Sequence, residues 1–199
     1  SQLEWVVTGY ALTFAAFMLT GGKLADLLGR RLVFVAGLAV FTAASLACGL
    51  AGDADMLIGA RVVQGIGAAM MNPATLSIIT ATFPARQRGT AIGIWAGVSA
   101  LALAIGPLVG GLLSEHVSWS WIFFVNVPVG VIAIVAAYLF IDESKDTSHG
   151  QRPDVPGLAT SAIGLFALTY ALIEANSHGW GSARILGAFA VAAVALVAF

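Results

Sequence analysis

Seven stretches of the sequence are apolar, carry no charged side chain and follow one another with short gaps. They are residues 5–22, 32–52, 62–85, 89–114, 117–141, 155–173 and 185–199. About 20 residues at a rise of about 1.5 Å each cross the hydrocarbon core of a bilayer. Six stretches are therefore long enough or nearly so, and the seventh is cut short where the sequence ends. Strands of a membrane barrel would alternate over about ten residues, so these continuous stretches predict an all-α membrane protein with about seven transmembrane helices.

The composition excludes several other classes of protein. Hydrophobic residues make up 59% of the sequence and charged residues only 10%, which leaves too little polar surface to coat a soluble domain. A net charge of −1 argues against a nucleic-acid partner, because such binding needs clustered bases. Cys48 lies in an apolar stretch, and no ligand spacing typical of a metal site or intramembrane enzyme occurs. We expect the lipid bilayer as the surrounding medium, no metal and no cofactor.

The first connection, residues 22–31, carries the bases Lys23, Arg30 and Arg31 with two hinge glycines. A short basic connection between spans is held on the cytoplasmic side of the membrane. The third connection adds Arg86 and Arg88, and the fifth adds Lys145 and Arg152. The odd connections are therefore expected to be cytoplasmic.

The fifth connection divides the sequence. Residues 142–157 mix charged side chains with Ser, Gly and Pro, a composition typical of a solvated linker. We expect residues 1–141 to form a transmembrane bundle and residues 158–199 to form two further spans, the last one truncated. The sequence starts without Met, enters an apolar stretch at once and ends inside another, which favours a fragment of a longer protein.

The third apolar stretch is preceded by a base and carries a polar face. Arg61, Gln64, Gly65 and Asn72 fall on one side of a helix. Because a charge inside a bilayer is costly, it usually faces a bundle interior or a water-filled cavity. The alternative is that Arg61 extends its side chain to the outer surface. The polar stripe favours a cavity lining, in which Arg61 would act on a nearby carboxylate or bind an anion.

The fourth apolar stretch contains Gly106, Pro107, Gly110 and Gly111, with further small residues in two strips. Small residues let neighbouring helices approach the backbone closely, and Pro107 is expected to kink the helix. Ordinary packing between membrane helices explains such spacing equally well.

Three motifs together resemble the major facilitator superfamily, and within it the drug:H+ antiporter family with fourteen spans. The first connection is similar to the superfamily motif between spans two and three, with Leu27 in place of the usual base. The matching residues are Gly22, Leu24, Asp26, Gly29, Arg30 and Arg31. Arg61, Gln64 and Gly65 resemble the motif of span four, and the Gly-Pro and Gly-Gly pairs resemble that of span five in antiporters.

A fourth match begins the next span. Trp119, Trp121, Asn126 and Pro128 resemble a segment at the start of span six in the fourteen-span branch, although Ser120 replaces the usual Arg. The two tryptophans also suit an aromatic belt at the membrane interface. Both roles, interfacial anchor and substrate contact, are open for them.

The resemblance implies a partial major-facilitator helical bundle containing spans two to eight, and a protein of the inner (plasma) membrane. It implies secondary active transport, in which a proton gradient drives the export of drugs or other lipophilic small molecules by alternating access. The first span, with an acidic coupling residue in many such antiporters, and the C-terminal half would lie outside this sequence. Arg61 would act on that residue, and Asp26 would close the cytoplasmic side through Arg30, Arg86 or a helix terminus in the missing half.

Other functions are open at this point. A symporter or facilitator for a small solute would share the first motif but should lack the Gly-Pro and Gly-Gly pairs of span five. A polytopic receptor or membrane enzyme fits less well, because clusters of acid/base residues are absent from the apolar stretches. Fourteen spans are favoured over twelve by the two spans after the linker.

Overall fold

The computed structural model describes residues 2–145 and 154–199, and the elements in them are helices. They are α1 (Gln2–Leu28), α2 (Arg30–Gly49), α3 (Ala54–Thr82), α4 (Ala85–His116), α5 (Trp121–Phe124), α6 (Asn126–Phe140), α7 (Val155–His178) and α8 (Ala183–Ala198). Six segments in these ranges are long and apolar enough to cross a membrane, with α5 and α6 counted as one, and α8 is a shorter apolar helix. The prediction of an all-α membrane protein is confirmed.

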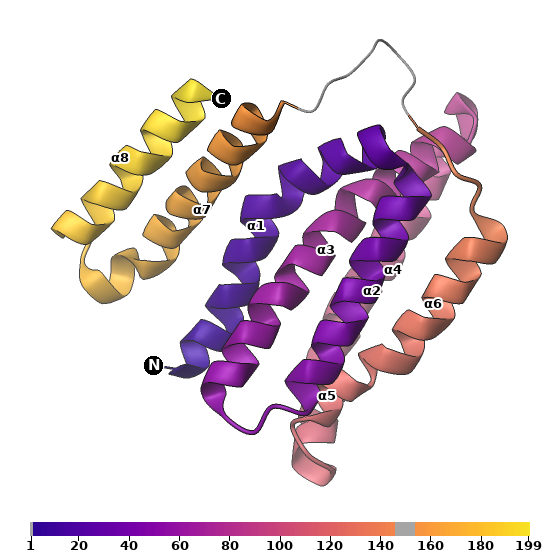
Figure 1. Ribbon diagram of the computed structural model, residues 1–199. Coiled ribbons are helices and arrows are strands. Elements are labelled where there is room, and N and C mark those ends of the chain that lie inside the picture. The colour runs from indigo at the N-terminus through magenta and orange to yellow at the C-terminus, as the bar shows by residue number, and fades with distance from the viewer. Residues whose placement is uncertain (1, 146–153) are drawn as a thin grey trace.

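Helix α3 is the centre of the bundle. It packs against α1 on one side and α2 on the other, while α6 lies against α2 and α7 lies against α1 (Figure 1). Helix α8 pairs with α7 at the edge of the molecule. In the described part of the chain, the α7–α8 pair reaches the rest of the protein through α1.

Two glycines of α3 set its distance from its neighbours. A Cβ atom on Gly65 would lie 2.6 Å from the Tyr10 carbonyl oxygen of α1, and one on Gly67 would lie 2.6 Å from the Phe41 backbone nitrogen of α2. The Thr13 hydroxyl of α1 also donates to the Val62 carbonyl of α3 at 2.9 Å. Small residues at such crossings allow the backbone contacts that drive association of helices in lipid.

Gly67→Ala is expected to destabilise the whole protein by about 1–3 kcal/mol, because the added methyl group meets backbone atoms that must shift. Gly59, on the same helix, has open space at its Cβ position. Gly59→Ala is the matched control and should be neutral or slightly stabilising, since Ala favours a helix over Gly. Thermal unfolding of the purified protein in detergent measures both. Equal melting temperatures for the two variants would contradict this packing.

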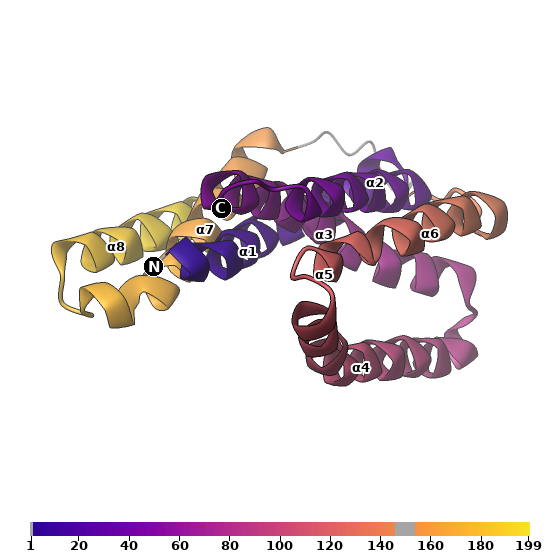
Figure 2. The same ribbon diagram turned by 90° about the horizontal axis from the view of Figure 1, so that it is seen from below.

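Helix α4 lies apart from the other helices (Figure 2). Among the described helices it contacts only α3 and α5, its neighbours along the chain, and none of its side chains is buried. Nothing within 4 Å would meet a Cβ atom on the glycines of its two strips, Gly93, Gly97, Gly106, Gly110 and Gly111. The close approach expected at these strips is therefore not made by any described segment, because the described helices pack around α3 instead.

The first connection is much shorter than the sequence predicts. Only Gly29 separates α1 from α2, so most of residues 22–31 are helical and the expectation of two hinge glycines is wrong. Residues 23–28 are mostly strong helix formers, and Gly22 lies inside α1, where a Cβ atom would sit 3.3 Å from Pro73 of α3. Gly22 therefore serves a helix crossing, and Gly29 alone makes the turn.

Two further boundaries differ from the expected ones. Arg86 and Arg88 lie in the first turn of α4 rather than in a connection. Helix α7 begins at Val155, within the expected linker, because the Asp154 carboxylate accepts from the Gly157 N–H at 3.0 Å and caps the helix. Arg152 lies outside the described residues.

Candidate functional site

The turn between α1 and α2 requires glycine for two reasons. Gly29 has a φ of 129°, a region that side chains other than glycine rarely adopt. A Cβ atom there would also lie 2.7 Å from the carboxylate carbon of Glu143. The turn and the segment after α6 therefore fit against each other at the backbone level.

Glu143 binds the beginning of α2. Its two carboxylate oxygens accept from the backbone N–H groups of Arg31 at 3.1 Å and Leu32 at 3.0 Å. The first N–H groups of a helix have no partner within the helix, and Gly29 offers no capping side chain. Glu143 supplies the missing acceptors, and its negative charge suits the positive end of the helix dipole.

The side chain of Arg31 adds to the contact between the segment after α6 and the beginning of α2. Its guanidinium donates to the Ile141 carbonyl at 3.0 Å, approaches Glu143 at 4.0 Å and lies 5.7 Å from the Tyr138 ring. The Arg30 N–H donates to the Ser144 carbonyl at 2.9 Å. The end of α6 is thus tied to the start of α2 by both backbone and side-chain groups.

Glu143→Ala is expected to lower the stability of the whole protein by about 1–2 kcal/mol, the range for a lost helix cap with a favourable charge. Glu143→Gln keeps an acceptor and should fall between this variant and the wild type. Asp142→Ala, at the exposed neighbouring position, is the control and should have little effect. Thermal unfolding in detergent measures the three variants, and equal losses for positions 142 and 143 would argue against the cap.

Asp26 forms an ion pair with a residue close by in the sequence. The Arg30 guanidinium donates to its carboxylate at 3.4 Å, one helical turn away. Arg30 was one of the partners expected for this acid, whereas Arg86 is exposed at the start of α4. Leu24, another residue of the motif, packs against a small cluster of Ala25, Val33 and Ala74 between the three helices.

Arg61 turns into the bundle towards α1. Its Nε donates to the Val6 carbonyl at 3.0 Å, and its guanidinium carbon lies 4.1 Å from the centre of the Tyr10 ring. It also lies 5.9 Å from the centre of the Phe123 ring of α5. The cation is therefore close to aromatic rings from two helices.

A hydrogen-bond chain continues from Arg61 to α2. The Arg61 guanidinium donates to the Gln64 side-chain oxygen at 2.6 Å, and the Gln64 amide donates to the Ser45 hydroxyl at 2.5 Å. Gln64 is 1% exposed and Ser45 is fully buried, so the chain is shielded inside the bundle. Within the described residues, the structure gives Arg61 only uncharged partners.

The residues expected on the polar face of α3 are not all brought together. Arg61 and Gln64 contact each other directly. Gly65 instead faces the backbone of α1, and Asn72 is partly buried further along α3, next to Pro73. Sequence reasoning missed Tyr10 and Ser45, whose only signal was a polar or aromatic side chain within an apolar stretch.

At the start of α5, phenylalanines rather than tryptophans contact the rest of the bundle. Trp119 and Trp121 are 43% and 49% exposed. The Phe124 ring instead lies where a Cβ atom on Gly49 of α2 would be. Asn126 donates to the Ile122 carbonyl at 3.4 Å, and Pro128 is exposed. Trp119, Trp121 and Pro128 are thus exposed and Asn126 is partly buried, whereas Phe123 and Phe124 make the contacts with α2 and α3.

Comparison with known proteins shows which family the sequence matches. The family described as the Major Facilitator Superfamily matches residues 1–199. The sequence is 39% identical to the tetracenomycin C resistance and export protein of Streptomyces glaucescens, over 100% of this chain and 37% of that protein. It is 41% identical to the methylenomycin A resistance protein of Bacillus subtilis, over 100% of this chain and 42% of that protein.

A solved structure shows the same fold. It is that of a bacterial homolog of the human lysosomal transporter Spinster, with a TM-score of 0.52 and 22% identity, and the match covers 99% of this chain and 51% of that one. The chain therefore spans about two fifths of the two resistance proteins and about half of the solved transporter.

Proposed function

The chain belongs to the Major Facilitator Superfamily, and on that premise we propose that the whole protein is a proton-coupled antiporter that exports drugs or other lipophilic small molecules. The observation that carries the proposal is Arg61, a cation inside the bundle whose described partners are all uncharged. Similarity to two antibiotic-resistance proteins supports export as the direction of transport.

The proposed coupling uses the charge of Arg61. A guanidinium stays protonated in proteins, so Arg61 does not carry the transported proton. A carboxylate from a segment outside this sequence would approach the guanidinium, and its protonation would weaken the attraction between them. Protonation of that carboxylate would thereby drive alternating access, in which two bundles move around a site at the midplane of the membrane.

The proposed gate lies at the end of the bundle that carries Gly29. Asp26 with Arg30, and Glu143 with Arg31, fix the ends of α1, α2 and α6 there. We infer from the basic residues that this end faces the cytoplasm and that the protein spans the inner (plasma) membrane several times. Residues 1–141 would form most of the N-terminal bundle and 158–199 an extra central pair of spans in a fourteen-span protein. Residues 142–157 would join them as a linker whose last three residues already belong to α7.

Drug accumulation in cells tests the proposal. Cells that lack their main efflux pumps and express the whole protein should accumulate less of a substrate antibiotic or fluorescent dye than cells with an empty vector. A protonophore that collapses the proton gradient should remove the difference. Export that continues at the same rate after the collapse would contradict proton coupling.

A further inference from the structure

The hydrogen bonds of Arg61 limit which of its atoms another group can reach. A guanidinium has five N–H donors in one plane. The single N–H of Nε donates to the Val6 carbonyl at 3.0 Å, and Nη1 donates to Gln64 at 2.6 Å. Within the described residues, Nη2 makes no hydrogen bond and is not enclosed. An incoming acceptor therefore binds at the end of the guanidinium, through Nη2 alone or together with the second N–H of Nη1.

The Tyr10 ring covers one face of this guanidinium. The guanidinium carbon lies 4.1 Å from the ring centre, well inside the distance of about 6 Å within which a cation is attracted to an aromatic face. The Phe123 ring, at 5.9 Å, is near that limit. Tyr10 therefore makes the stronger of the two aromatic contacts, and its ring resists rotation of the guanidinium out of its present plane.

The Tyr10 ring is itself held in place by its surroundings. The backbone of Tyr10 lies against α3, because a Cβ atom on Gly65 would come within 2.6 Å of the Tyr10 carbonyl oxygen. The ring is parallel to that of Phe14, with an angle of 3° between the two planes and 6.1 Å between the ring centres. The crossing of α1 and α3 therefore fixes the distance from Tyr10 to Arg61.

We propose that Tyr10 is a positioning residue for Arg61, whose guanidinium it holds so that Nη2 stays free for an acceptor from another part of the whole protein. This proposal rests on the proposed function, in which a carboxylate approaches Arg61. Tyr10 lies outside the motifs that the sequence shares with the family. Its hydroxyl group makes no hydrogen bond with a described residue, so the ring face carries the role.

Fluorinated phenylalanines at position 10 test the ring face. Each added fluorine weakens the attraction of the face for a cation and changes the shape of the ring little. Tyr10→Phe should keep proton-driven export close to the wild-type rate, and mono-, di- and trifluorophenylalanine should lower it stepwise. Tyr10→Leu should lower it about tenfold, as for a partly buried cation–π contact. The loss should appear in kcat and leave the substrate KM unchanged, because Tyr10 acts through Arg61 and not on the drug.

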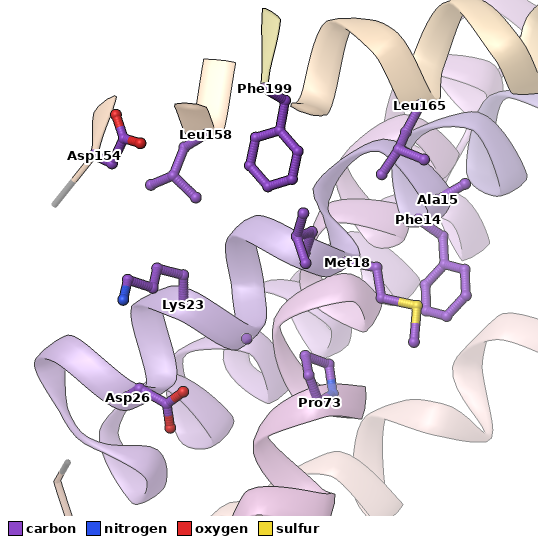
Figure 3. Close-up of a pocket in the computed structure, with 12 residues that line it drawn as sticks. Phe14, Ala15, Met18, Lys23, Asp26, Pro73, Asp154, Leu158, Leu165 and Phe199 are labelled. Atoms are coloured by element: carbon purple, nitrogen blue, oxygen red, sulfur yellow. The ribbon is translucent and has the colours of Figure 1, made fainter. Parts of the chain in front are cut away.

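Two other positions calibrate the series. Phe17 is exposed on the same helix, and trifluorophenylalanine there should leave export unchanged. Phe14 is unsuitable as a control, because it lies against Tyr10 and lines, together with Met18, a pocket between α1, α3 and α7 (Figure 3). Trifluorophenylalanine in place of Phe123 should have a smaller effect than at position 10, since that ring is farther from the cation.

Chemical modification of Arg61 gives a readout that does not need export. Phenylglyoxal reacts with guanidine groups, and mass spectrometry of the purified whole protein measures the rate at residue 61. A guanidinium held against the ring should react slowly, so the rate should be unchanged in Tyr10→Phe, increase with each fluorine and be highest in Tyr10→Leu.

The two readouts separate this proposal from the proposed function. Equal modification rates in Tyr10→Leu and Tyr10→Phe, or export that does not follow the fluorine series, would overturn the role of Tyr10. If the wild type does not export, the proposed function fails, and the modification rate still decides whether Tyr10 holds Arg61.

Discussion

Arg61→Ala is expected to reduce proton-driven export by the whole protein by about 100-fold or more. A unit charge about 4 Å from a carboxylate contributes about 4 kcal/mol at an effective dielectric constant of 20, and the alanine variant loses this interaction completely. The measurement is efflux of a substrate dye that a protonophore inhibits, normalised to the amount of protein in the membrane.

Arg61→Lys should recover only part of the activity. The arginine uses separate nitrogen atoms for Val6 and Gln64 and lies over the Tyr10 ring, and a single ammonium cannot reproduce this fork. Arg184 offers a matched control, because it also lies near a tyrosine ring, 5.6 Å from that of Tyr170, but it is exposed and outside the hydrogen-bond chain. Arg184→Ala should export normally. Normal export by Arg61→Ala would remove the proposed basis of coupling.

Asp26→Asn is expected to reduce export by about tenfold. The loss of the charge weakens the contact with Arg30, and a shift of about 1.4 kcal/mol towards the open cytoplasmic side changes the population of the closed state tenfold. The partly buried ion pair within one helical turn alone contributes less than this, so the prediction includes a further contact of Asp26 in the closed state of the whole protein. Asp26→Glu keeps the charge and should retain more activity.

Accessibility of the cytoplasmic end reports the same change directly. In a whole protein whose cysteines, Cys48 among them, are all replaced by Ser, a Leu27→Cys substitution places one thiol beside the gate. A membrane-impermeant maleimide, added to inside-out vesicles, should label it faster when Asp26 is Asn. Undiminished export together with an unchanged labelling rate would count against Asp26 as part of a gate.

The spans themselves could be predicted from the sequence because the bilayer fixes their length and polarity. The ends of the helices could not be predicted in the same way. Lys23 and Asp26 follow directly after an apolar stretch, so the sequence predicts that they lie in a connection, yet α1 continues to Leu28. A charge marks where a segment leaves the hydrocarbon core, whereas the hydrogen-bonded helix continues into water until Gly29 breaks it.

Contacts between helices could not be predicted from the sequence alone. Glu143 binds the backbone of Arg31 across 112 residues, and in the sequence it is only one of several charges in a linker. Gln64 carried a signal because it shares a helical face with Arg61, but its partner Ser45 lies on a different helix. Periodicity describes one helix at a time, so it identifies the polar face of α3 without showing which neighbour covers it.

Proton movement in proteoliposomes tests the central claim of antiport most directly. The purified whole protein is reconstituted with a pH-sensitive dye inside the vesicles, and a substrate drug is added outside without an imposed pH gradient. Antiport predicts that drug entry drives protons out and raises the internal pH, and that Arg61→Ala abolishes the signal. Acidification of the interior together with the drug, or drug entry without any pH change, would contradict the account.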